Sequence, residues 1–141
     1  YYKGAHALHM LRYIIGKETL WASLKEYLQM PKELPDNQTS TDEFISLIEE
    51  NSGMKLDWFF NQYFFKKELP TLKKFEKTIN NKKYVDLWWE EVDFKMPVEI
   101  NYFSFDGKRY KKLDLDNKPK RFVIPSDSKL IIDPNRWLLY K

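Results

Sequence analysis

The hydrophobic pattern of this chain changes its period near Pro70, and that change limits what the chain can fold into. Before this proline, apolar residues recur every three or four positions, as on one helical face: Leu8, Leu11, Ile14 and Ile15. After it, they recur at every second position, as in a half-buried strand: Val85, Leu87 and Trp89. The sequence therefore predicts an α+β fold, with a helical part in residues 1–69 and a β part in residues 70–141.

About four helices are expected in the first part. The first begins near Ala5 and ends at Gly16, because glycine readily takes the left-handed conformation of a helix C-terminus. The second covers the periodic run 20–28, which comes before Pro31 and Pro35.

The third and fourth helices carry start signals. Ser40 stands three residues before Glu43, the spacing of a capping box. The helix that it opens is expected to end at Ser52–Gly53 and to bury Phe44, Leu47 and Ile48. The fourth is expected to begin near residue 56 or 57, where the Asp57 carboxylate favours the positive end of the helix dipole, and to continue to about Lys66.

The second part is predicted to form a small antiparallel β-sandwich. Asn80–Asn81 and Asp106–Gly107 are turn pairs that tolerate positive φ, so they are expected to connect hairpins. Six or seven short strands at this spacing are typical of a sandwich. Beyond the runs around Val85 and Val98, the strand candidates are residues 110–115, 121–124, 129–132 and 137–140.

The composition is that of a folded domain, and its charge does not indicate a nucleic-acid partner. Aromatic residues make up 17% of the 141 residues and only four are glycine, which argues against a linker or a disordered tail. Residues 1–67 carry 8 basic and 9 acidic side chains, and residues 68–141 carry 16 and 12. We interpret this modest excess, including Lys108–Arg109 and Lys120–Arg121, as solvated strand edges, and we expect no nucleic-acid partner.

Other partner classes are limited by what the sequence lacks. There is no cysteine, so disulfides are excluded, and localisation stays open. No apolar run approaches the roughly 18 residues of a membrane span, and we expect no membrane partner.

The first sixteen residues carry the most specific motif. Tyr1-x-Lys3-Gly4-Ala5, followed by 8-Leu-His-Met-Leu-Arg-12, resembles the catalytic-tyrosine helix of the aminopeptidase N family of zinc metallopeptidases, of the gluzincin type. The resemblance continues in order through three further groups: Ser40–Thr41 with Phe44, Ser52–Gly53 with Leu56, and Phe59–Phe60 with Gln62. It is looser in the second part, where it covers Pro70 with Leu72, Pro97–Val98 with Ile100, and Ile132–Asp133–Pro134.

The resemblance implies a function for Tyr1. In the family this tyrosine donates a hydrogen bond to the oxygen that becomes negative when a peptide carbonyl is attacked, while zinc activates the water. The family's zinc motif, His-Glu-x-x-His, does not occur in these 141 residues. The resemblance therefore implies the C-terminal part of a catalytic domain plus the following β-sandwich, cut from a zinc aminopeptidase that removes N-terminal residues from peptides.

This interpretation fixes the expected cofactor and partners. We expect zinc in the parent enzyme and none in this chain, which alone should be inactive. The parent would bind a peptide substrate, and this chain would pack against the missing N-terminal, zinc-binding part. Apolar helix surface left uncovered would then favour self-association. Tyr63 and Glu68–Leu69 depart from the family pattern at a common Trp and a common Gly, which leaves the substrate preference open.

Three alternatives remain open. His6 and His9 are three residues apart, whereas zincin helices place their ligands four apart with Glu after the first, so we interpret them as surface or packing residues. Trp88 and Trp89 lie on opposite faces of a predicted strand, and an exposed one could serve a non-enzymatic binding module for protein, peptide or carbohydrate. A pseudopeptidase that acts only as a scaffold is the third possibility.

Overall fold

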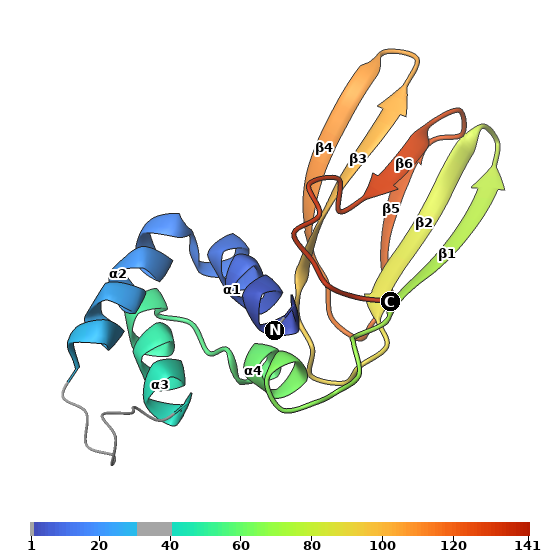
Figure 1. The fold of residues 1–141 in the computed structure, drawn as a ribbon. Coiled ribbons are helices and arrows are strands. Elements are labelled where there is room, and N and C mark those ends of the chain that lie inside the picture. Colours follow the sequence, from blue (N-terminus) through green and yellow to red (C-terminus); the bar gives the residue numbers. More distant parts are fainter. Residues whose placement is uncertain (1, 31–40) are drawn as a thin grey trace.

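Four helices precede six strands in the part of the chain that a computed structural model describes, residues 2–30 and 41–141 (Figure 1). This arrangement confirms the predicted α+β class. The helices are α1 (Tyr2–Ile15), α2 (Lys17–Gln29), α3 (Thr41–Ser52) and α4 (Asp57–Tyr63). The strands are β1 (Leu72–Ile79), β2 (Lys82–Trp89), β3 (Pro97–Ser104), β4 (Gly107–Asp114), β5 (Lys120–Pro125) and β6 (Lys129–Ile132).

Glycines end two of the helices, as predicted. Gly16 is the single residue between α1 and α2; its φ is +93° and its N–H donates to the Arg12 carbonyl at 2.9 Å. Gly53 follows α3 with φ +68°, and its N–H donates to the Glu49 carbonyl at 2.9 Å. Both positions need a conformation that costs a residue with a Cβ.

The third and fourth helices match the predictions in part. Helix α3 buries the three expected apolar residues, Phe44, Leu47 and Ile48. Ser40, the expected capping residue, lies outside the described residues. Helix α4 ends at Tyr63 rather than near Lys66. Beyond it, the Gln62 side-chain amide donates to the Glu68 carbonyl at 2.9 Å and holds the chain in a turn that no longer continues the helix.

The strands form two antiparallel sheets of three, in the orders β1-β2-β5 and β4-β3-β6 (Figure 1). The predicted turn pairs connect the hairpins: Asn80 and Asn81 have φ of +50° and +64°, and Gly107 has φ of +122°. Val85, Leu87 and Trp89 of β2 are all fully buried, as their spacing predicted. The sandwich is thus confirmed, with six strands in the described residues.

The predicted strand 137–140 was wrong. Residues 133–141 follow β6 as an irregular segment, here called the C-terminal segment. At residues 137–139, side chains rather than a neighbouring strand bind its backbone. Asp133 accepts the N–H groups of Trp137 and Leu138, and the Tyr63 hydroxyl donates to the Leu139 carbonyl at 2.8 Å.

Strand β3 is buried on both faces, which simple alternation does not predict. Val98 and Ile100 face the interior, yet Glu99 and Asn101, on the other face, are only 9% and 8% exposed. Glu99 lies opposite Lys112 on β4, and the Lys112 ammonium lies 4.6 Å from the centre of the Tyr13 ring. Helix α1 therefore reaches the outer face of this sheet through Tyr13, near Glu99 and Lys112.

The helices and the sandwich share one core. Phe94, in the loop between β2 and β3, has its ring edge-on to Trp58 of α4 and to Trp89 of β2, at 5.4 and 4.9 Å between ring centroids. Buried residues from both parts form a single hydrophobic cluster. The packing across residues 69–70 is thus continuous. The division of the chain into two domains at this point stays a prediction.

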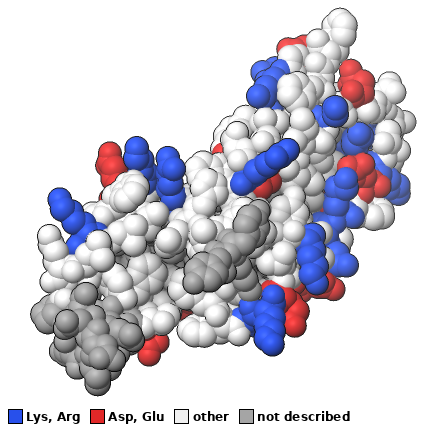
Figure 2. Space-filling model, in the orientation of Figure 1, with Lys and Arg blue, Asp and Glu red and all other residues white. Residues whose placement is uncertain are grey.

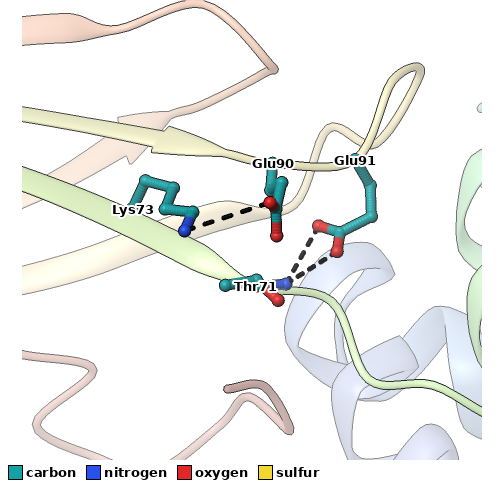
Figure 3. A network of polar contacts seen from close by, with 4 residues as sticks. All are labelled: Thr71, Lys73, Glu90 and Glu91. Atoms are coloured by element: carbon teal, nitrogen blue, oxygen red, sulfur yellow. Dashed lines mark hydrogen bonds and ion pairs between the residues drawn. The ribbon is translucent and has the colours of Figure 1, made fainter.

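The segment that joins the two parts is fixed by polar contacts (Figure 3). The Thr71 N–H lies 2.9 Å from each carboxylate oxygen of Glu91, and the Lys73 ammonium pairs with Glu90 at 3.9 Å. The C-terminal residue binds the same joining segment. The Lys141 N–H donates to the Pro70 carbonyl at 2.8 Å, and the Leu72 N–H donates to the Lys141 carbonyl at 3.0 Å.

Within the described residues, no helix is long and apolar enough to cross a membrane.

Candidate functional site

The predicted catalytic residue, Tyr1, lies outside the described residues. The structure shows the contacts that hold helix α1, which follows Tyr1 in the sequence. Helix α1 packs on the C-terminal segment through three side chains spaced along one face, His6, His9 and Tyr13, and the three meet Trp137. We call this set of four residues the α1 clamp.

Aromatic stacking forms the centre of the α1 clamp. The His9 ring lies 4.5 Å from the Trp137 ring with 20° between the planes, and the Tyr13 ring lies 5.4 Å away with 19° between the planes. The His6 Nε2 atom is 3.1 Å from the Trp137 carbonyl oxygen. The Arg12 guanidinium lies 6.0 Å from the centre of the indole, within reach of a cation–π contact. Two turns of α1 are thereby fixed to one indole.

Asp133 holds Trp137 in place. One carboxylate oxygen accepts the Trp137 N–H and the other accepts the Leu138 N–H, both at 2.9 Å. The Asp133 backbone is itself bound, since its N–H donates to the Glu99 carbonyl at 2.8 Å. Its φ is +50°, in the left-handed region that Asp and Asn tolerate better than most residues. The sequence pattern included Asp133 but gave no reason to see it as the residue that orients the indole.

Two tyrosine hydroxyls tie the helices to the sandwich. Tyr13 donates to the Pro97 carbonyl at 3.1 Å, and Tyr63 donates to the Leu139 carbonyl at 2.8 Å. Burial, and next the negative charge of Glu99, raise the pKa of Tyr13 well above its usual range. Burial, and next Glu91, do the same to the pKa of Tyr63. Both phenols therefore stay protonated and act as structural donors.

A polar cluster lies beneath the α1 clamp on β3. The Tyr110 hydroxyl donates to one carboxylate oxygen of Glu99. The second Glu99 oxygen and the Asn101 side-chain oxygen are buried and have no partner within the described residues. Sequence reasoning missed both residues, because alternation places them on the solvent face of their strand.

The histidines do not form a metal site with the residues around them. The His6 and His9 rings meet edge to face at 5.6 Å, and His9 is stacked on Trp137. Within the described residues, no group of three or more His, Cys, Asp or Glu side chains could hold a metal ion. The resemblance implies zinc in the parent enzyme and not in this chain, so none of the described residues is assigned to hold it. Burial, followed by His6 and Arg12, lowers the pKa of His9.

Comparison with known proteins does not decide the family. No protein-family model and no curated protein sequence matches this chain. The resemblance to the aminopeptidase N family therefore stays a prediction from the sequence motifs.

A groove lies between the helices and the sandwich, beside the α1 clamp. Its volume is about 420 Å³, and its wall combines apolar side chains from both parts with four charged ones: Ile14, Met54, Trp58, Pro97, Leu115, Lys95, Lys112, Asp114 and Asp116. It shares Lys112 with the contact to Tyr13.

Neither tryptophan of the pair Trp88–Trp89 is fully exposed, as a binding platform would require. Trp89 is fully buried and its indole N–H donates to the Met96 carbonyl at 2.9 Å. Trp88 is half-buried on the opposite face of β2. Binding of a carbohydrate or peptide at Trp88 stays a hypothesis.

Proposed function

We propose that this chain supplies the transition-state-stabilising tyrosine, Tyr1, and the supporting β-sandwich of a zinc-dependent aminopeptidase. The sequence motif Tyr1-x-Lys3-Gly4-Ala5, with the ordered pattern after it, is the basis of the proposal. The fold agrees with it, since four helices are followed by two antiparallel three-stranded sheets, the architecture that the resemblance implies.

The observation that supports a catalytic role is the way α1 is held. A hydrogen-bond donor stabilises a developing oxyanion effectively only when it is preorganised. Helix α1 directly follows Tyr1 and is fixed to the sandwich by stacking of His9 and Tyr13 on Trp137. The sandwich therefore has a defined task in the proposal, which is to hold the helix that carries the donor.

The proposed chemistry of Tyr1 is simple. Attack on a peptide carbonyl places negative charge on its oxygen, and a phenol O–H donates a hydrogen bond to that oxygen. Loss of one such donor typically lowers the rate about 100-fold to 1,000-fold. Tyr13 and Tyr63 do not compete for this role, because each donates to a backbone carbonyl inside the protein.

The proposal makes the chain a partner of a zinc-bearing segment. Residues 1–141 alone are then expected to bind no stoichiometric zinc and to hydrolyse no amino-acid anilide. Elemental analysis and an anilide assay on the purified chain test this directly. One tightly bound zinc per chain, with hydrolysis that a chelator abolishes, would show that the chain carries a complete site and would contradict the proposal.

The positioning role can be tested separately in the complete gene product. Trp137→Ala is expected to lower kcat for an anilide about tenfold or more, since even small misplacement of a catalytic group is costly. Trp137→Phe, which keeps an aromatic ring beside His9, should retain most of the activity. A loss that appears only in KM, or that is equal in both variants, would remove the sandwich from the catalytic account.

A further inference from the structure

The end of the sandwich opposite the helices is formed by three turns, here called the distal end: residues 79–83, 103–109 and 126–129 (Figure 1). Hydrogen bonds and strand pairing join these turns. The Ser126 N–H donates to the Asn81 carbonyl at 3.0 Å, and the Lys83 ammonium donates to the Ser128 carbonyl at 3.2 Å. Phe103 and Lys129 are paired residues of β3 and β6. The three turns therefore form one continuous surface.

The distal end exposes apolar side chains at its most projecting point. Phe105, in the turn between β3 and β4, is 99% exposed, which is more than any other large apolar side chain among the described residues. Phe103, on β3 of the same hairpin, is 39% exposed, and Ile79, at the end of β1 in the other sheet, is 43% exposed. An aromatic ring at the tip of a hairpin with no protein neighbour gains stability only from something outside the chain.

Basic side chains outnumber acidic ones at the distal end. The distal end carries five cationic residues, against two carboxylates at Asp106 and Asp127: Lys82, Lys83, Lys108, Arg109 and Lys129. Asp106 and Arg109 pair at 3.5 Å and so partly offset each other, and Asp106 also accepts the Ser104 hydroxyl; the four lysines and Asp127 supply the remaining charge. Figure 2 shows white surface at the upper tip of the sandwich, with both red acidic and blue basic groups below it on either side.

We propose that the distal end docks on an anionic lipid surface, with Phe105 entering the interface and the basic residues contacting the head groups. A convex aromatic tip, at an end of the sandwich with more cationic than acidic side chains, suits a soft, negatively charged bilayer surface, which needs no preformed pocket. An acidic protein partner would have to supply a cavity that matches Phe105.

This docking differs from membrane insertion by a helix. The expectation of no membrane partner rested on the lack of a long apolar run, which bears on spanning segments and not on surface contact. The docking is also independent of the proposed peptidase role, because the distal end lies away from α1 (Figure 1).

Vesicle co-sedimentation of the complete 141-residue chain tests the proposal. Binding is expected to vesicles of phosphatidylcholine with about 30% phosphatidylserine, and to be much weaker on phosphatidylcholine alone. Raising the salt from about 0.1 M to about 0.5 M should weaken it strongly, because the screening length shortens.

Substitutions at the distal end separate the two contributions. Phe105→Ser should weaken binding about tenfold, by removing the inserted apolar surface. Lys108→Glu together with Arg109→Glu should weaken it more than about 25-fold, since each nearby cation contributes about fivefold. The matched control is Phe75→Ser, at a 52% exposed position in the middle of β1, which should bind as the parent does.

Three outcomes would overturn the proposal. The first is no dependence on phosphatidylserine, and the second is an equal effect of Phe75→Ser and Phe105→Ser. The third is binding to soluble polyglutamate that matches vesicle binding and ignores Phe105→Ser, which would point to an acidic protein surface. Thermal unfolding of each variant checks that the fold is kept, and Phe105 is too exposed for its loss to disturb the core.

Discussion

The imidazole of His9 lies stacked on the indole of Trp137, although one residue is near the start of the chain and the other is near its end. This contact, with that of Tyr13, makes the C-terminal segment part of the support of α1. A substitution in the last ten residues should therefore be felt in the first helix.

Trp137→Ala is expected to destabilise the chain by about 3 kcal/mol, because a large aromatic side chain that packs on three α1 residues is removed. Urea unfolding followed by circular dichroism measures this. Trp21→Ala is the matched control, since Trp21 is 60% exposed on α2; its cost should stay within about 0.5 kcal/mol. Equal costs for the two substitutions would show that Trp137 does not carry the α1 clamp.

Asp133 combines a strained backbone conformation with two hydrogen bonds, and three substitutions separate these contributions. Asp133→Ala removes both bonds and disfavours φ +50°, and should cost about 2 to 4 kcal/mol. Asp133→Gly keeps the conformation and loses the bonds, while Asp133→Asn keeps the conformation and one acceptor. The expected order of stability is Asp, then Asn, then Gly, then Ala, measured as unfolding free energies. An Ala variant as stable as Asn would contradict the role given to this carboxylate.

Gly4 and Gly16 provide a matched pair in and after the same helix. A Cβ added at either glycine would meet no atom within 4 Å, so only the backbone differs. Gly16 has φ +93°, and Gly16→Ala should cost about 1 kcal/mol or more. Gly4 lies within α1, where Gly4→Ala should stabilise by about 0.5 kcal/mol. Changes of the same sign in chemical denaturation would show that α1 does not end as described.

The lowered pKa of His9 predicts a pH dependence of stability. The folded chain favours neutral His9, so the unfolded chain binds more protons as the pH falls through the usual histidine range near 6.5. Stability should be full above that range and should decrease below it. His9→Phe keeps an aromatic ring on Trp137 and should remove this part of the decrease. Thermal midpoints measured between pH 7.5 and pH 5, as the difference between parent and variant, check the prediction; a constant difference would contradict it.

Self-association of the chain stays a prediction. Exposed apolar residues on α2 allow it to be tested. Trp21 and Leu28 are seven residues apart and so lie on one face of α2. Their side chains are 60% and 73% exposed. Light scattering at rising concentration should show oligomers, and replacing both residues by Ser should reduce them. A monomer at high concentration in both proteins would contradict the expectation.

The sequence predicted the elements whose pattern is local. The glycine ends of α1 and α3, the apolar face of α3, and the inward residues of β2 follow from short-range spacing and from the few conformations open to Gly and Asn. The predictions failed where distant side chains decide. The 137–140 strand is absent because Asp133 and Tyr63 bind that backbone. Glu99 and Asn101 are buried on the face that alternation assigns to solvent, and both Tyr13 of α1 and the C-terminal segment reach β3 beside Glu99.

The α1 clamp was hidden from sequence reasoning for the same reason. His6 and His9 were interpreted from their spacing as surface or packing residues, and nothing local indicated Trp137 as their partner. The histidines of α1 and the Asp133–Pro134 turn with Trp137 lie at opposite ends of the sequence. Their pairing can be predicted only when the two ends are known to meet in the fold.

The central proposal, that Tyr1 is the donor for the oxyanion, is tested most directly by turnover of an amino-acid anilide in the complete gene product. Tyr1→Phe removes only the hydroxyl and is expected to lower kcat about 100-fold to 1,000-fold. Tyr2→Phe, the neighbouring control, should leave kcat within about twofold, since that position does not match the catalytic one. Unchanged turnover in Tyr1→Phe, or equal losses in the two variants, would contradict the account.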